Sequence, residues 1–431
     1  MGATPVLPFV SLLPMKDTLG VLLAGGAGER LYPLTRDRAK PAVTFGGNYR
    51  IIDITLSNCI NSDLRRVYIL TQYKALSLNR HIREGWSSVV ARELGEFIEI
   101  LPPMKRVSEN WYLGTADAVY QNIYSIGSEQ CKYVIILSGD HIYKMNYQLM
   151  LDQHVAAGAD VTLATILIDP SETRHFGVME ISRDGRITGF EEKPKETKLR
   201  SPYNPEMVSA SMGVYIFNTD VLLPVLLKDA EDPGSSHDFG KDILPKILDQ
   251  YKIYAYNFID ENMKEAQYWR DVGTLEAYYE ANMDLVSVSP VFNLYDKHWP
   301  IRTHQRQYPP AKFVFGEPGR TGTAIDSIVC PGCILSGGNV RNSVLSSDVR
   351  VNSYTSVDAS IIFSHVNIGR HCRIRRAIID RDVHIPEGTV IGYDPEQDAK
   401  NFVVTESGIT VVTRDYSLFE SPVAVDYFTS E

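Results

Sequence analysis

The second half of the chain carries aliphatic residues at a fixed spacing of 17. Three positions roughly six residues apart begin the series, and each recurs in the following turns. The positions are Ile328, Ile334, Val340, Leu345, Val351, Val357, Ile362, Ile368, Ile374, Ile379, Ile385 and Ile391. A β-sandwich of short strands, the alternative, would not keep this period over four turns. Three short legs per turn, each with an inward aliphatic side chain, predict a left-handed parallel β-helix whose coils bury their apolar sides by stacking.

The first half shows a different pattern, in which short apolar runs alternate with helical periodicity. We predict strands over residues 19–24, 66–71 and 133–138, and helices over residues 51–61 and 116–126. Such alternation is typical of an α/β, Rossmann-like domain with a mostly parallel sheet and helices on both faces. The stretch 295–322 is rich in proline and glycine, which predicts a linker. The chain therefore divides into a first domain over 1–294, the linker over 295–322 and the β-helix domain over 323–431.

Composition and charge exclude several classes of protein. The 431 residues carry a net charge of -10, whereas nucleic-acid binding needs a basic face. The start, MGATPVLPFVSLLPMKD, has no basic leader and is interrupted by prolines, and no apolar run approaches the length of a membrane span. The five scattered cysteines are typical of reduced thiols. We therefore expect a cytoplasmic protein that binds neither nucleic acid nor membrane.

A glycine-rich loop, LAGGAGERL over residues 23–31, follows the first predicted strand. Gly25, Gly26 and Gly28 allow the backbone to come close to a ligand, and successive N–H groups there can bind an anion. Three cations follow, at Arg30, Arg38 and Lys40. A dinucleotide-binding loop starts similarly but does not need so many cations, and a solvated cationic loop is the structural alternative. The density of positive charge beside the glycines favours a nucleoside triphosphate.

Two carboxylates lie at the ends of predicted strands. Asp140 belongs to the motif LSGDH and Asp271 to YWRDVGT. One or two carboxylates are what Mg²⁺ at phosphates usually takes, and both side chains are expected at the carboxyl edge of the sheet. The alternative for Asp140 is that it caps a following helix. Lys193, which follows the strand-like run 185–190, is placed to hold one further phosphate as a point charge.

Taken together, these segments resemble the bacterial and plant glucose-1-phosphate adenylyltransferases, also called ADP-glucose pyrophosphorylases. The resemblance covers nearly the whole chain and includes LAGGAGERLYPLTRDRAKPAV, YRIIDITLSNCINS, ENWYLGTADAV, LSGDHIY, FGVM, EEKP, SMGVYIF, SSHDFGKDILP and YWRDVGTLEAY. It implies a nucleotidyltransferase domain followed by a β-helix for regulation and oligomerisation. It also implies Mg²⁺-dependent adenylyl transfer from ATP to glucose 1-phosphate, a role in glycogen or starch-type glucan synthesis, control by anionic metabolites, and a homotetramer.

The resemblance also implies roles for individual residues. The ATP-binding residues would be Gly25, Gly26, Gly28, Arg30, Lys40 and Gln72. The glucose 1-phosphate site would be formed by Tyr112, Gly177, Glu192, Lys193, Ser211, Asp238 and Trp269. The catalytic residues would be Arg30, Lys40, Asp140 and Asp271, of which Asp140 and Asp271 would hold the metal.

The chain departs from the enterobacterial members of this family at the proposed effector site. Those members carry a lysine before the RAKP motif, where this chain has Asp37, and the tail after Arg414 lacks their basic cluster. Arg38, Arg50 and Lys400 remain as candidate contacts for an anionic effector. We therefore expect such an effector, but not strong activation by fructose 1,6-bisphosphate.

Three alternatives stay open on the sequence. One is a sugar nucleotidyltransferase that uses UTP or dTTP. Another is a non-catalytic regulatory subunit, against which the presence of all the carboxylates and phosphate-binding cations argues. The third is an acyltransferase, because β-helices often carry that activity with a histidine between coils; His365 and His371 are present, but nothing around them indicates a coenzyme site.

Overall fold

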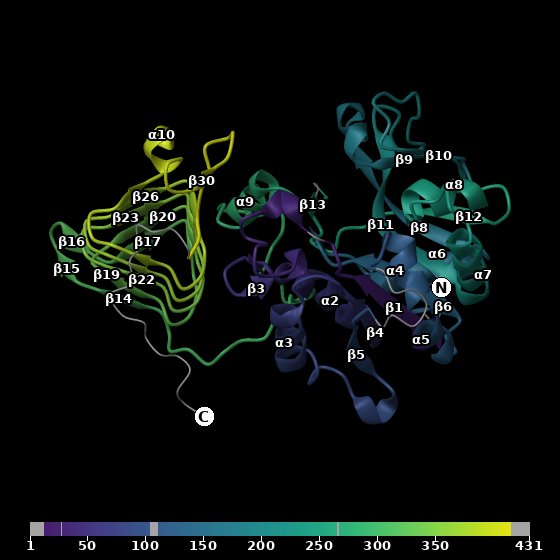
Figure 1. Cartoon of the computed structure of the whole chain (residues 1–431), viewed down its shortest axis with the longest axis horizontal. Helices are drawn as coiled ribbons and strands as arrows, with labels where there is room; N and C mark the ends of the chain where they lie inside the picture. The colour runs from purple at the N-terminus through teal and green to yellow at the C-terminus, as the bar shows by residue number, and fades with distance from the viewer. Residues whose placement is uncertain (1–12, 27, 104–110, 265–266, 415–431) are drawn as a thin grey trace, which may run out of the picture.

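The computed structural model describes residues 13–26, 28–103, 111–264 and 267–414. The segment 1–12 and the tail 415–431 lie outside the described residues. The expectations about a leader at the start and a basic cluster in the tail concern these two segments. The chain forms an α/β part and a β-helix that lie side by side (Figure 1). Within the described ranges, no helix is both long enough and apolar enough to cross a membrane.

A nine-stranded sheet forms the centre of the α/β part. Its strands in spatial order are β10 (Ile187–Glu192), β9 (Gly177–Ile181), β11 (Val208–Asn218), β6 (Tyr133–Ser138), β1 (Thr18–Leu23), β4 (Arg66–Leu70) and β5 (Phe97–Leu101), with β8 (Val161–Ile168) beside β11 and β12 (Ile253–Asn257) beside β8. The strands from β6 to β5 are parallel, as predicted, whereas β11 runs antiparallel to β6, β8 and β9. The predicted strands 19–24, 66–71 and 133–138 correspond to β1, β4 and β6.

Helices cover both faces of this sheet, because successive side chains of its buried strands point to opposite faces. Ile135 and Leu137 belong to one core and Val134 and Ile136 to the other. The first core is closed by α1 (Leu13–Lys16), α2 (Ile51–Asn61), α3 (Leu76–Gly85) and α6 (Tyr147–Ala156), and the second by α4 (Thr115–Gln121), α5 (Ile123–Ser128), α7 (Thr219–Ala230) and α8 (Leu244–Ile247). The helix predicted over 116–126 is divided at Asn122, whose side chain donates to the carbonyl of Ala118.

A two-stranded antiparallel ribbon lies apart from the large sheet. It consists of β7 (His141–Tyr143) and β13 (Trp269–Asp271), and helix α9 (Leu275–Asp284) follows it. We expected Asp271 at the carboxyl edge of the large sheet, and its side chain does lie beside Asp140, which follows the end of β6, but its strand does not belong to the large sheet. Its strand pairs with β7, which directly follows Asp140, and the register sets Asp271 opposite His141. The ribbon therefore brings the two aspartates together by a different route.

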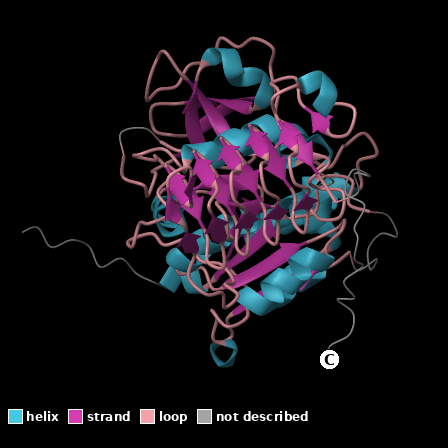
Figure 2. Cartoon of the chain, turned by 90° about the vertical axis from the view of Figure 1, so that its left-hand side faces the viewer, coloured by secondary structure: helices cyan, strands magenta, loops and turns pink. Residues whose placement is uncertain are grey.

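Three parallel sheets form the β-helix, which confirms the left-handed β-helix predicted from the repeat. The first contains β14 (Lys312–Val314), β19 (Ile334–Ser336), β22 (Arg350–Val351), β25 (Asn367–Ile368) and β28 (His384–Ile385). The second contains β17 (Thr323–Ile325), β20 (Asn339–Arg341), β23 (Ser356–Asp358), β26 (Arg373–Arg375) and β29 (Val390–Ile391). The third contains β18 (Ile328–Val329), β21 (Val344–Leu345), β24 (Ile361–Ile362), β27 (Ala377–Ile379), β31 (Thr410–Val412) and β30 (Val403–Val404), which alone runs antiparallel. Figure 2 shows these strands stacked in front of the α/β part.

The first coil of the β-helix corrects the register that we predicted. Val329 and Leu335, not Ile328 and Ile334, align with Leu345 and Val351 of the next coil. Two legs of this coil are thus displaced by one residue from the predicted register. A shift of one residue moves each side chain to the opposite face of its strand, so Val329 and Leu335 take the repeat positions predicted for Ile328 and Ile334. All later pairs keep the spacing of 17, from Leu345 opposite Ile362 to Ile374 opposite Ile391. Helix α10 (Pro395–Asp398) interrupts the last coil before β31 resumes beside β27.

The β-helix is attached to the α/β part through an apolar core that both share. Val344, Ile361 and Ile378 of the third sheet belong to the same buried cluster as Phe45 and Tyr278. Strand β14 already pairs with β19, so the first strand of the β-helix lies inside the stretch predicted as linker. Shorter elements complete the described structure. They are the strands β2 (Thr44–Phe45), β3 (Tyr49–Arg50), β15 (Gly316–Glu317) and β16 (Arg320–Thr321), the short 3₁₀ helices η1 (Glu29–Leu31), η2 (Lys40–Ala42), η3 (Arg92–Leu94) and η4 (Pro170–His175), and the π-helix η5 (Phe239–Ile243).

Truncation of the repeat residue Ile374 is expected to destabilise the protein. Its side chain is fully buried in the β-helix core, so Ile374→Ala leaves a cavity and should lower the free energy of unfolding by about 2–5 kcal/mol. Ile325 is 49% exposed in strand β17 of the same sheet, and Ile325→Ala serves as the matched control. Thermal unfolding followed by circular dichroism measures both variants. Equal shifts in the melting temperature would contradict the inward position of the repeat residue.

Candidate active site

The glycine loop leaves strand β1 between two parallel neighbours. The amide of Ala24 donates to the carbonyl of Leu70 at 2.9 Å, and the loop then continues to η1. Gly28 has a φ of 66°, a left-handed conformation that favours glycine. A Cβ at this position would lie 3.0 Å from Thr35 and 3.1 Å from Lys40. Glycine therefore allows the loop to fold back, so that its later cation lies directly beside its glycines.

Lys40 contacts both predicted metal-binding carboxylates. Its Nζ lies 2.7 Å from Oδ2 of Asp140 and 3.0 Å from Oδ1 of Asp271, although the three residues are far apart in the sequence. The lysine side chain is only 8% exposed, whereas the two aspartates are about one-third exposed. Asp140 also accepts a hydrogen bond from the hydroxyl of Ser138, and it precedes strand β7, not a helix, which contradicts the capping alternative.

Charge attraction sets the ionisation of this cluster. Burial by itself would raise the pKa of Asp140, but the ammonium of Lys40 and the neighbouring His141 hold it well below its ordinary value. Burial by itself would lower the pKa of Lys40, but Asp140 and Asp271 raise it above its ordinary value. Both groups are therefore charged at neutral pH. A buried cation between two partly exposed carboxylates, beside a glycine loop, can serve a polyphosphate that arrives with a divalent cation.

Arg30 lies on the open side of the same cluster. Its side chain is 71% exposed, and its Nη2 approaches Oδ2 of Asp271 at 3.9 Å. Solvent screens this long contact, so it adds little to stability and leaves the guanidinium free to move. The structure thus gathers Gly28, Arg30, Lys40, Asp140 and Asp271 as the sequence predicted.

His141 is a site residue that the sequence reasoning missed, although it is adjacent to Asp140 in the LSGDH motif. Its Nε2 lies 3.5 Å from Oδ1 of Asp140, and its ring packs edge-on against Trp269 with centroids 4.8 Å apart. Asp140, His141 and Asp271 together offer three ligand atoms within 4.8 Å of one another. Among the described residues, His141 Nδ1 and Trp269 Nε1 have no hydrogen-bond partner although both atoms are buried.

A second group of predicted residues lies where β9 and β10 pair. Gly177 is directly opposite Glu192, and a Cβ on Gly177 would lie 2.8 Å from the carboxylate of Glu192 and 2.4 Å from the ring of Phe190. Lys193 follows with a positive φ of 47°, which is uncommon for a residue with a side chain, and its Nζ pairs with Glu192 at 3.0 Å. The lysine is 59% exposed, so it is available to an anion.

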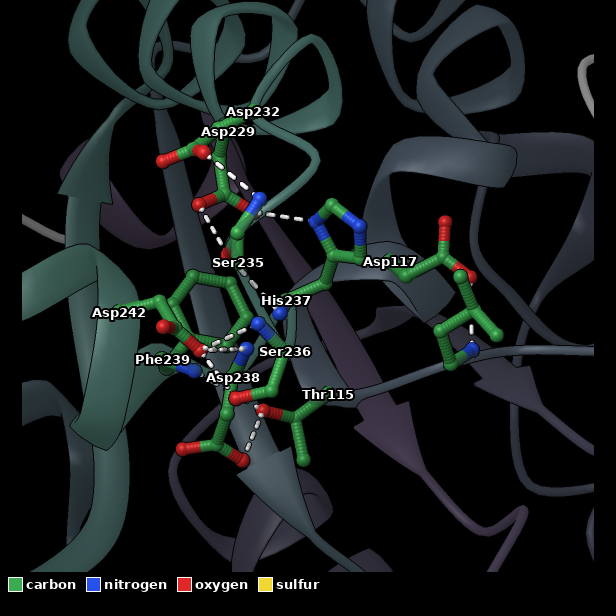
Figure 3. Close-up of polar contacts among 12 residues, drawn as sticks. Thr115, Asp117, Asp229, Asp232, Ser235, Ser236, His237, Asp238, Phe239 and Asp242 are labelled. Carbon is green, nitrogen blue, oxygen red and sulfur yellow. Dashed lines mark hydrogen bonds and ion pairs between the residues drawn. The ribbon is translucent and has the colours of Figure 1, made fainter.

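Asp238 lies beside this second group but is occupied by its own chain. One of its carboxylate oxygens accepts from the amides of Gly240 and Lys241, and the other accepts from the hydroxyl of Thr115 at 3.0 Å (Figure 3). Gly240 in turn lies against Glu192, where a Cβ would meet its carboxylate at 3.0 Å. Asp238 thus borders the site, but its hydrogen bonds join the start of η5 to Thr115, the first residue of α4.

Three other predicted residues border the two groups. Gln72 packs against Gly25 and accepts a hydrogen bond from the amide of Tyr112 at 3.1 Å. Burial raises the pKa of Tyr112, whose hydroxyl accepts a hydrogen bond from Asn122.

Ser211 lies at an irregularity of β11, and Gly213 of the same irregularity approaches His141. Gly26 faces open space beside the loop.

The three candidate effector contacts are not gathered at one place. Arg38 is buried and forms an ion pair with Asp380 of the β-helix, a partner that the sequence gave no means of finding. Burial lowers the pKa of Arg50 to about 10, and the nearby cations Arg381 and Arg38 contribute to that shift. Lys400 is exposed beside α10, and its Nζ donates to Gln397. No described contact joins Lys400 to either arginine.

Comparison with known proteins agrees with the division of the chain into an α/β part and a β-helix. A family model described as "Nucleotidyl transferase" matches residues 19–288, and one described as "GlmU-like, C-terminal hexapeptide" matches residues 309–412. The first model covers more than half of the chain and contains the glycine loop and both aspartates. The second covers the coils of the β-helix.

Several curated relatives match nearly the whole chain. The glucose-1-phosphate adenylyltransferase of Koribacter versatilis is 80% identical, covering 97% of this chain and 100% of the relative. The protein of the same name from Rhodopirellula baltica is 55% identical, covering 96% of this chain and 93% of its own. That of Shewanella sp. (strain ANA-3) is 54% identical over 93% of this chain and 95% of its own.

Gly114 provides a test of the loop that carries Tyr112. A Cβ there would lie 2.3 Å from the carbonyl oxygen of His237 and 2.4 Å from that of Ser236, so Gly114→Ala must separate two backbones. Such overpacking costs about 1–3 kcal/mol, and we expect the melting temperature to fall by at least ~2 °C. Gly127 lies in α5 with open space around it, so Gly127→Ala is expected to be neutral or slightly stabilising. Indistinguishable melting curves for both variants would contradict the contact.

Proposed function

The chain belongs to the glucose-1-phosphate adenylyltransferases, and from that premise we propose how its residues carry out the reaction. The enzyme is a nucleotidyltransferase. We take its substrates as ATP and glucose 1-phosphate, and its products as ADP-glucose and pyrophosphate. One observation carries this proposal: Lys40 contacts Asp140 and Asp271 beside the glycine loop, which combines cations for a triphosphate with carboxylates for a divalent metal.

The metal that we propose is Mg²⁺, held by Asp140 and Asp271. Their carboxylates are hard oxygen donors, which Mg²⁺ prefers, and they lie close enough together to share one ion. When bound, Mg²⁺ supplies a Lewis acid that neutralises charge on phosphate oxygens. The remaining steps depend on the residues of the chain itself.

A phosphate oxygen of glucose 1-phosphate attacks the α-phosphorus of ATP in line. A new P–O bond forms, the bond to the β-phosphate breaks, and pyrophosphate leaves with the electron pair. The attacking phosphate monoester has a second pKa of about 6, so it is already ionised and needs no general base. The backbone of Gly25, Gly26 and Gly28 together with Arg30 and Lys40 orients the triphosphate and neutralises the leaving charge.

The second group of residues is proposed to hold glucose 1-phosphate. Lys193 binds its phosphate as an exposed point charge, and Glu192 accepts hydrogen bonds from sugar hydroxyls. Gly177 leaves the space that a side chain would fill beside Glu192. The pocket is bordered by Tyr112, Ser211, Asp238 and Trp269, and Gln72 lies between it and the glycine loop. The unpaired Nε1 of Trp269 supports this placement, because a buried donor is costly without a partner.

Regulation by an anionic metabolite is proposed at the border between the two parts of the chain. Arg38 and Arg50 lie there within reach of each other's charge, and Arg381 adds a third cation. Although Arg38 is paired with Asp380, its charge still contributes to lowering the pKa values of Arg50 and Arg381, and an anion beside Arg50 and Arg381 would relieve that repulsion. Lys400 is a weaker candidate, since it lies beside α10 without a described contact to this cluster. We further propose a cytoplasmic homotetramer that supplies ADP-glucose for glycogen or starch-type glucan synthesis.

A pyrophosphate-release assay with ATP, Mg²⁺ and glucose 1-phosphate tests the proposed reaction. UTP and dTTP in place of ATP test the choice of nucleotide, and added anionic metabolites test regulation. Release of pyrophosphate with UTP or dTTP, but not with ATP, would overturn the assignment of ATP.

Asp140→Asn is expected to lower kcat by roughly 10²–10⁴-fold with little change in either KM. The substitution removes a charge that acts mainly when negative charge redistributes in the transition state. Asp152→Asn is the matched control, because Asp152 lies on α6 and accepts only from Gln148 in the described contacts. Steady-state kinetics on both variants measures the effect. Turnover near the wild-type value for Asp140→Asn would remove Asp140 from its proposed role.

Lys193→Ala is expected to raise the KM for glucose 1-phosphate by roughly 10–100-fold, since a charge-assisted contact to one phosphate is lost. The KM for ATP is expected to stay within about threefold, because the lysine belongs to the second group of residues. Lys195→Ala, two positions further along the same exposed stretch, is the control. An equal loss for both substrates would contradict the assignment.

A further inference from the structure

A buried ion pair joins the segment that carries Lys40 to the β-helix. Nη2 of Arg38 lies 2.9 and 2.8 Å from the two carboxylate oxygens of Asp380, which is 342 residues away in the sequence. Both residues are 5% exposed. Because desolvation offsets the attraction within a buried pair, its net contribution to stability is small, but the loss of one partner would leave an uncompensated buried charge.

The aspartate end of this pair is fixed by its own backbone. Asp380 follows β27, its amide donates to the carbonyl of Val412 at 2.8 Å, and its Oδ1 also accepts from the amide of Arg381. These hydrogen bonds belong to the stacked coils of the β-helix. Asp380 is therefore a rigid point on the β-helix, not a mobile side chain on a loop.

The arginine end lies two positions before Lys40 in the sequence. Only Ala39 separates them, and the backbone then turns tightly, with the amide of Ala42 donating to the carbonyl of Ala39 at 2.9 Å. A displacement of Arg38 is thus passed directly to the backbone of Lys40. The ammonium of Lys40 must lie within hydrogen-bond distance of two carboxylates, so it tolerates little displacement.

Asp271 has a comparable connection through α9. Thr274 caps that helix three positions after Asp271, and Tyr279 on its next turn donates to the carbonyl of Ala359 in the β-helix at 2.6 Å. Figure 1 shows α9 on the side of the α/β part that faces the β-helix. Asp140, in contrast, follows the large sheet directly. Two of the three charged groups in the cluster are therefore anchored on the β-helix.

We propose that Arg38 and Asp380 are a positioning pair, through which the β-helix holds Lys40 between Asp140 and Asp271. Neither residue touches the substrates in this role. The inference rests on the function proposed for Lys40, and it extends that function to a residue, Asp380, in the other part of the chain. A shift of about 1 Å in a group that orients reacting atoms can reduce turnover roughly 10²-fold, so the pair can control kcat without forming part of the pocket.

The test is a double-mutant cycle on the full-length enzyme, assayed by pyrophosphate release without added anionic metabolites. Asp380→Asn is expected to lower kcat by roughly 10–100-fold while both KM values stay within about threefold. Lys40→Met is expected to lower kcat by roughly 10²–10³-fold. In the Lys40→Met background, Asp380→Asn is expected to cost less than about threefold more, because a positioning residue has nothing left to position.

Two further variants keep the test decisive. Arg38→Lys retains a cation beside Asp380 and is expected to fold with a smaller loss of kcat, again absent in the Lys40→Met background. Asp382→Asn is the matched control on the same turn: Asp382 pairs with His365, Arg381 and Arg414 and makes no described contact with the segment before Lys40. Its kcat is expected to stay near the wild-type value. Thermal melting reports the folded fraction of every variant.

The outcomes separate the inference from the function on which it rests. If Lys40→Met is inactive and Asp380→Asn turns over normally, the positioning pair is wrong and the proposed function stands. Additive losses in the cycle, or a melting shift with unchanged kcat per folded enzyme, would show that the pair is only structural. Normal turnover by Lys40→Met would overturn the role of Lys40 and the positioning pair together.

Discussion

The arrangement of this enzyme depends on one buried ammonium between two carboxylates. Asp140 and Asp271 carry like charges that would repel one another at this separation, and the ammonium of Lys40, in contact with both, offsets that repulsion. The three residues come from the glycine loop, the large sheet and the small ribbon. Each of these segments must therefore be held firmly, because an error in any one of them would separate the charges. Much of the surrounding structure can be understood as support for this contact.

The β-helix provides part of that support through packing as well as charge. Its third sheet shares a buried apolar cluster with Phe45 and Tyr278, and the hydroxyl of Tyr278 donates to the carbonyl of Thr44 just after the Lys40 turn. Apolar burial is non-directional, so it brings the two parts together without fixing their exact relation. The directional contacts, from Tyr279 to Ala359 and from Arg38 to Asp380, then set that relation. Both contacts end on backbone or on a residue held by backbone.

Sequence reasoning succeeded where the determining interactions are local or periodic. The fixed spacing of aliphatic residues identified the β-helix, and glycines next to cations identified the phosphate-binding loop. It failed by one residue at Ile328 and Ile334, because the first coil, which follows the β15–β16 hairpin, advances by 16 residues to the next coil, whereas the coils after it advance by 17. It misplaced the strand of Asp271, since three residues give no periodicity. It could not find Asp380, whose partner lies 342 residues away and leaves no local pattern.

The residue types at positions 38 and 40 suit two different tasks. Arginine carries a delocalised, weakly hydrated charge that is ionised at every physiological pH, so it can remain buried against one carboxylate as a permanent structural contact. Lysine carries a compact charge on a flexible stem, and its three donors can be shared among partners or redirected to phosphate oxygens. A contact that must never change therefore uses Arg38. A contact that must accommodate a substrate uses Lys40, and only one residue separates the two, so the fixed contact determines where the adaptable one can reach.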